Sequence, residues 1–92
     1  MVDPVVDAVT GFFAGRVPRK KLDKTLAGPC NGLGSVLALL KLAEWAALQS
    51  GDQKLLNLCL FKACQSEISE GEADVVLAMF REVESVACLS AS

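Results

Sequence analysis

The chain has 92 residues, of which 52% are hydrophobic and 22% charged, and its formal net charge is −2. A chain of this length is expected to form one helical domain, residues 1–92, with a folded surface of about 5,100 Å². Its apolar content exceeds what one small core can hold, which favours self-association. The slightly negative charge excludes a polycation that binds nucleic acid over its whole surface.

Histidine is absent, which removes the usual general base, the histidine-dependent nucleophile pairs and the commonest metal ligand. The four cysteines lack the paired C-x₂-C spacing of zinc sites; they are Cys30, Cys59, Cys64 and Cys88. We therefore predict no catalytic residue, no metal and no cofactor, and a protein that is not an enzyme.

The beginning of the sequence, MVDPVVDAV, has no basic segment before an apolar run, so no secretory signal is expected. No uncharged apolar run reaches the about 18 residues of a membrane span. These two observations predict a cytoplasmic protein with reduced cysteines.

Two short helices are predicted in the first third of the chain. Asp3 and Pro4 suit the N-cap and first position of a helix that should end near Gly15. Pro18 indicates the start of a second helix, RKKLDKTLA, which the following Gly-Pro pair closes.

The stretch from Leu33 to Ser50 is the most apolar in the chain and is rich in good helix formers. On a helical wheel, one side holds Lys41, Trp45 and Gln49, and almost all of the remaining circumference is apolar. An ordinary surface helix has an apolar stripe of about 100°. This central helix, near 33–50, should therefore be covered on nearly all sides, by its own chain or by a partner.

A fourth helix is predicted from Gln53 to about Ser66, with Asp52 as its N-cap. Its main apolar face consists of Leu55, Leu56, Cys59, Leu60 and Ala63. Leu58 and Phe61 fall on the opposite side, among polar residues, and are the clearest misplaced apolar side chains in the chain.

A fifth helix is predicted to begin at the capping box formed by Ser69 and Glu72 and to end near Cys88, with residues 89–92 frayed. Its expected buried face consists of Val75, Val76, Met79, Phe80, Val83, Val86 and Ala87.

Together these patterns predict an all-α fold, a compact bundle of four or five helices. We expect a non-enzymatic module that works by protein–protein contact, as a homodimer joined through apolar helix faces. Trp45 suits an interface anchor because it combines a large apolar area with a polar N–H group. The predicted interface residues are Leu37, Lys41, Glu44, Trp45, Leu48, Leu58 and Phe61.

Basic residues gather in the second helix, whereas residues 66–92 are acidic. The basic cluster consists of Arg16, Arg19, Lys20, Lys21 and Lys24. A helix face of this kind can contact phosphates without reading bases. The alternative interpretation is a solvated face on which Arg19 pairs with Asp23, four residues later.

Nucleic-acid binding by a dimer is therefore the second functional hypothesis. Its general plan resembles that of small viral silencing suppressors that sequester double-stranded RNA. The resemblance concerns architecture alone, since no residue motif matches such a family.

Glu44 is an acidic residue within the apolar arc of the central helix. A carboxylate is costly to bury unless it is paired. We therefore expect Glu44 to face a crevice or a subunit boundary and to form an ion pair with Lys20, Lys21 or Lys24 of the second helix. The alternative is that Glu44 reaches water.

Overall fold

The computed structural model describes residues 3–30, 32–66 and 69–91, with side-chain surroundings given for these residues except Ser50 and residues 87–91. No strand occurs in these ranges. This confirms the predicted all-α bundle. The elements are α1 (Pro4–Phe13), α2 (Arg19–Leu26), α3 (Leu33–Trp45), the π-helical turn η1 (Ala46–Ser50), α4 (Gln53–Gln65) and α5 (Glu70–Ala91).

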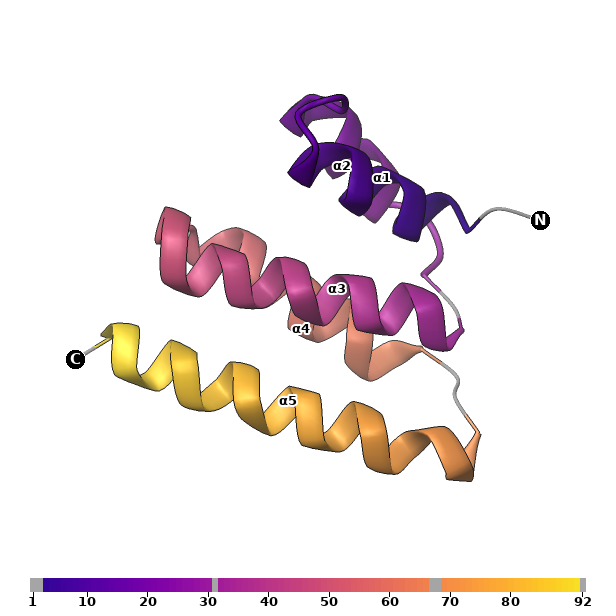
Figure 1. Cartoon of the computed structure of the whole chain (residues 1–92), viewed down its shortest axis with the longest axis vertical. Coiled ribbons are helices and arrows are strands. Elements are labelled where there is room, and N and C mark those ends of the chain that lie inside the picture. The colour runs from indigo at the N-terminus through magenta and orange to yellow at the C-terminus, as the bar shows by residue number, and fades with distance from the viewer. Residues whose placement is uncertain (1–2, 31, 67–68, 92) are drawn as a thin grey trace.

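Helix α3 lies at the centre of the molecule and packs against α1, α4 and α5 (Figure 1). Helices α1 and α2 pack together on one side of α3, and α5 runs along the other side. The principal dimensions are 40 × 34 × 19 Å. The shortest of them corresponds to about two layers of helices at the usual separation of 8–10 Å, so the bundle is a thin slab in which many helix faces remain open.

The core is built around the leucines of α3. Leu39, Leu40 and Leu42 are fully buried, as are Leu22 and Leu26 of α2. Burying one such side chain stabilises a fold by about 1.5–3 kcal/mol. The other helices contribute Val5 and Val9 from α1, Leu55, Leu56 and Cys59 from α4, and Val76 and Val83 from α5.

The helix starts follow the predicted capping residues. The Asp3 carboxylate accepts hydrogen bonds from the backbone N–H groups of Val5 and Val6, at 2.9 and 3.3 Å. The Asp52 carboxylate accepts one from Leu55 N–H at 3.0 Å. Each carboxylate satisfies N–H groups that the first turn leaves without a partner.

Helix α1 ends in a tight turn that brings the following residues back against the helix. Gly15 has φ +80°, and the N–H of Arg16 donates to the carbonyl of Gly11 at 2.8 Å, as in a Schellman motif. The chain then turns back so tightly that a Cβ on Gly11 would lie 2.5 Å from Cγ2 of Val17. Only glycine fits at position 11 without displacing Val17.

The predicted central helix 33–50 differs from the structure at its end. Regular α-helix stops at Trp45, and the remaining residues form the π-helical turn η1 before Gly51, whose φ is +64°. A single wide turn of this kind changes the direction of the side chains that follow it. Ala46 remains buried, whereas Leu48 is exposed.

Two expectations about α5 were wrong. Val75 was placed on the buried face but is 52% exposed, because α5 packs against only one side of the bundle, formed by α3 and η1. The helix also extends to Ala91, beyond the predicted end near Cys88, and Ser92 lies outside the described residues. No glycine or proline follows Gly71 in the sequence, so nothing in it interrupts the helical hydrogen bonds.

Candidate functional site

Two neighbouring hollows on the surface of α3 share lining residues. The first, of about 460 Å³, lies between α1 and α3 and is lined by residues that include Val6, Phe13, Leu37, Ala38 and Lys41. The second, of about 320 Å³, is lined by Phe13, Lys41, Glu44, Trp45, Leu48 and Gln49. Because Phe13 and Lys41 line both hollows, we treat them as one feature and call it the α1–α3 groove.

The groove exists because α1, α4 and α5 together leave one side of α3 partly uncovered. Leu37, Lys41 and Glu44 are separated by four and three residues, which places them on one side of α3. Leu48 belongs to the π-helical turn η1, and it lines the same hollow as Lys41 and Glu44. Leu37 and Glu44 are half-buried, and Lys41 and Leu48 are exposed. The structure therefore brings together five of the seven predicted interface residues, since Trp45 also lines the groove.

Aromatic rings form the wall of the groove near its centre. The ring of Phe12 meets Trp45 edge-on, with centroids 5.2 Å apart, and Phe13 meets Trp45 at 6.1 Å. Edge-to-face contacts of this kind are favourable because the positive edge of one ring faces the negative face of another. They fix the indole of Trp45 while leaving Phe13 46% exposed.

Phe13 is the groove residue that the sequence analysis missed. It lies at the last position of α1, where the chain turns away at Gly15 and leaves about half of the side chain exposed. The predicted helix end near Gly15 was the signal that could have indicated its exposure.

The two remaining predicted interface residues lie outside the groove. Leu58 is half-buried and packs against the core, so it is not the misplaced apolar residue that its helical position suggested. Phe61 is 58% exposed on α4, as expected, but it does not line either hollow.

The predicted ion pair between Glu44 and the second helix is not formed. Glu44 is half-buried and faces the α1–α3 groove, and no ion pair joins it to another residue of the described part of the chain. The physical reason is the position of α2, which packs against α1 and not along this side of α3. Lys20, Lys21 and Lys24 therefore cannot serve as its partners.

The basic cluster on α2 is divided by the structure. Arg16, Lys20, Lys21 and Lys24 are exposed, but Arg19 is used within the chain. Its Nε lies 2.9 Å from Oδ1 of Asp23, which is the pairing proposed as the alternative to phosphate binding. Its guanidinium also lies 2.9 Å from Oδ2 of Asp52, a contact between α2 and the start of α4 that the sequence did not reveal.

The contact between Arg19 and Asp52 shifts the pKa values of both residues. The hydrogen bond from Leu55 N–H and the bond from Arg19 lower the pKa of Asp52. The hydrogen bonds to Asp23 and Asp52 raise the pKa of Arg19, which opposes its desolvation. Asp52 therefore binds a proton less readily in the folded chain than in the unfolded chain, whose aspartates have a pKa of about 3.9.

This difference predicts a stability contribution that depends on pH. The charged form of Asp52 stabilises the fold above about pH 4, and the contribution is lost as the pH falls through the lowered pKa of the folded state. Asp52→Asn keeps a capping side chain but removes the charge. We expect the difference in unfolding free energy between wild type and this variant to be larger at pH 7 than at pH 2.5. Equal differences at both pH values, measured by urea unfolding, would contradict the assignment.

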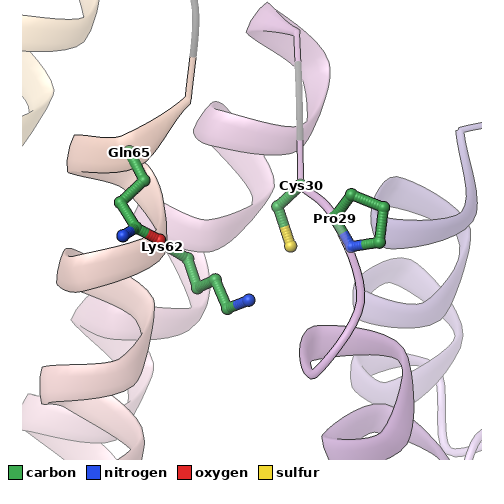
Figure 2. Close-up of a pocket in the computed structure, with 4 residues that line it drawn as sticks. All are labelled: Pro29, Cys30, Lys62 and Gln65. Atoms are coloured by element: carbon green, nitrogen blue, oxygen red, sulfur yellow. The ribbon is translucent and has the colours of Figure 1, made fainter.

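A third hollow, of about 410 Å³, lies where the connection between α2 and α3 meets α4. Figure 2 shows the Cys30 thiol and the Lys62 ammonium group directed into it. Lys62 donates a hydrogen bond to the carbonyl of Gly28 at 3.3 Å, and the Ser66 hydroxyl donates to the carbonyl of Cys30. These bonds hold the connection between α2 and α3 against α4, so the polar groups around the hollow have a structural role.

The described thiols differ in their surroundings. Cys30 and Cys59 are buried, and Cys64 is exposed. Burial raises the pKa of Cys30, and it raises the pKa of Cys59 to about 12, so both thiols are poor nucleophiles. The side chain of Cys88 lies outside the described part of the chain. The expectation of reduced cysteines stays a prediction.

Within residues 3–30, 32–66 and 69–91, no group of three or more acidic or cysteine side chains could hold a metal ion. In the same part of the chain, no helix combines the length and the apolar character needed to cross a membrane. No protein-family model, curated protein or solved structure matches the chain.

Proposed function

We propose that this protein is a non-enzymatic helical module that forms a homodimer through the α1–α3 groove. The observation that carries the proposal is the set of accessible apolar side chains that line the two neighbouring hollows of the α1–α3 groove, with Phe13 46% and Leu48 54% exposed. Apolar patches of this kind, flanked by charged residues, are typical of protein interaction sites. The cytoplasmic location predicted from the sequence belongs to the same proposal.

The total surface area supports a missing partner. The chain has an accessible surface of 5818 Å². A folded monomer of this mass is expected to have about 5,100 Å², so about 700 Å² is in excess. That excess is comparable to the about 800 Å² that each partner buries in a standard protein interface. Burying exposed apolar area contributes most of the favourable free energy of association.

Trp45 and Phe13 have the properties of an anchor for such an interface. Phe13 lines both hollows of the groove and Trp45 lines the second, and the contact between the two rings orders them in the absence of a partner. Aromatic side chains at the centre of an interface often supply most of its binding energy. A ring that is already fixed loses little conformational entropy on association.

Leu48→Asp tests the proposal because it places a charge on the exposed edge of the groove. We expect the wild type to elute with twice the chain mass at about 100 µM, and the variant to dimerise at least about tenfold more weakly. The measurement is size-exclusion chromatography with light scattering over a range of concentrations. Phe61→Asp is the matched control, since Phe61 is as exposed as Leu48 but lies outside the groove.

A wild-type chain that remains monomeric at 100 µM would overturn the proposal. Equal weakening by Leu48→Asp and Phe61→Asp would place the interface elsewhere. The double-stranded RNA hypothesis predicts retardation of a duplex at low salt that is lost at high salt. We rank it second because Arg19, one of its five cations, is engaged by Asp23 and Asp52.

A further inference from the structure

The accessible side of α3 and η1 has a symmetric order of side chains. Along the groove it presents Leu37, Lys41, Glu44 and Leu48, that is, an apolar residue, a cation, an anion and an apolar residue. The sequence spacings of four, three and four residues are the same when read in either direction, and Leu48, although it belongs to the π-helical turn η1, lines the same hollow as Lys41 and Glu44. The centre of this order lies between Leu42 and Ala43.

A chain segment with this order is complementary to a reversed copy of itself. When two copies lie antiparallel around a two-fold axis at that centre, each Leu37 faces Leu48 of the other copy. Each Lys41 then faces Glu44 of the other copy. A parallel arrangement in the same register would instead place Lys41 against Lys41 and Glu44 against Glu44, which is repulsive. Contacts of the first kind, in which two residues exchange roles, define a two-fold symmetric interface.

Neither charged group pairs within the described part of the chain. No ion pair joins Lys41 or Glu44 to any other residue that the structure describes, although both line the groove. Glu44 is also half-buried, where a carboxylate gains most from a partner. The cation that Glu44 was predicted to find on the second helix is, in this arrangement, supplied by a second copy.

We infer that two copies of this chain dock with their α3 helices antiparallel, so that Lys41 and Glu44 form reciprocal ion pairs between Leu37–Leu48 contacts. The inference rests on the proposed function and adds the occupant's orientation and register. Phe13 lines both hollows beside Lys41, so this register also brings the aromatic wall of the groove close to the two-fold axis.

Charge reversal at the two positions provides a specific test. Lys41→Glu gives a chain with two anions on the groove, and Glu44→Lys gives a chain with two cations. Each variant alone should dimerise at least about tenfold more weakly than wild type, because like charges face each other. An equimolar mixture of the two should form a heterodimer close to wild type in affinity, since every anion then faces a cation. The double variant K41E/E44K should recover the homodimer.

The experiment uses native mass spectrometry or sedimentation of the full chain, with circular dichroism to verify that each variant is folded. Lys24→Glu on α2 is the control for a change of net charge outside the groove. The antiparallel register is wrong if the wild type dimerises and both single variants dimerise as tightly as the wild type. It is also wrong if the mixture of the two variants does not recover the dimer. A wild-type monomer would instead overturn the proposed function itself, so the two failures are distinguishable.

Discussion

Replacing Leu39 by alanine is expected to lower the free energy of unfolding by about 2–5 kcal/mol, the range for removing a buried leucine side chain. Leu39 is fully buried in α3, the helix that contacts α1, α4 and α5. The cavity would therefore form at the centre of the slab, where surrounding side chains from several helices cannot all move to fill it. Urea unfolding followed by circular dichroism measures the change.

Leu37→Ala is the matched control for this prediction, since it removes the same atoms two residues away on the same helix. Leu37 is half-buried and lines the α1–α3 groove. Its replacement should reduce the stability of the monomer clearly less than Leu39→Ala, while weakening the dimer. Equal losses of monomer stability would mean that the two sides of α3 are equally covered, which contradicts the structure.

Asp3→Ala is expected to have the second largest effect on stability, because one carboxylate has two tasks. It caps α1, and its Oδ2 accepts a hydrogen bond of 2.6 Å from the hydroxyl of Ser35, which is 1% exposed. Losing an N-cap costs about 0.5–2 kcal/mol. Leaving a buried hydroxyl without its partner costs about 1–3 kcal/mol. Thermal and urea unfolding should together show a loss near the sum of these ranges.

Ser35→Ala separates the two contributions. This variant removes the buried hydroxyl while leaving the capping bonds from Asp3 to Val5 and Val6 in place, so its cost should be smaller. In a double-mutant cycle, the pair Asp3→Ala and Ser35→Ala should cost less than the two single changes added together. Strict additivity would show that the Asp3–Ser35 bond contributes nothing to stability.

The positions of the helices could be predicted from local chemistry. Asp3, Asp52 and Ser69 indicated where helices begin, and the helices start directly after each of them. Gly51 marked the end of the central segment, and its positive φ explains why. These signals depend on backbone groups within a few residues, so the sequence alone was sufficient to place them.

The side of α3 that stays open was decided by the tertiary structure. Helical periodicity predicts a buried face only when polar residues mark the opposite side. The central helix is apolar almost all round, so its sequence predicted Leu37 as an interface residue without showing how much of it the chain's own helices would cover. The packing of α1, α4 and α5 decided it, and left Leu37 and Leu48 in the groove.

Ion pairs between residues far apart in the chain could not be predicted from the sequence either. Arg19 was expected to pair with Asp23, four residues away, and it does, but its bond to Asp52 spans 33 residues. From charge alone, the sequence predicts a partner for Glu44 on α2. The pair is not formed, because α2 packs against α1 and not along this side of α3. Local spacing determines contacts within one helix, whereas contacts between helices depend on how the whole bundle packs.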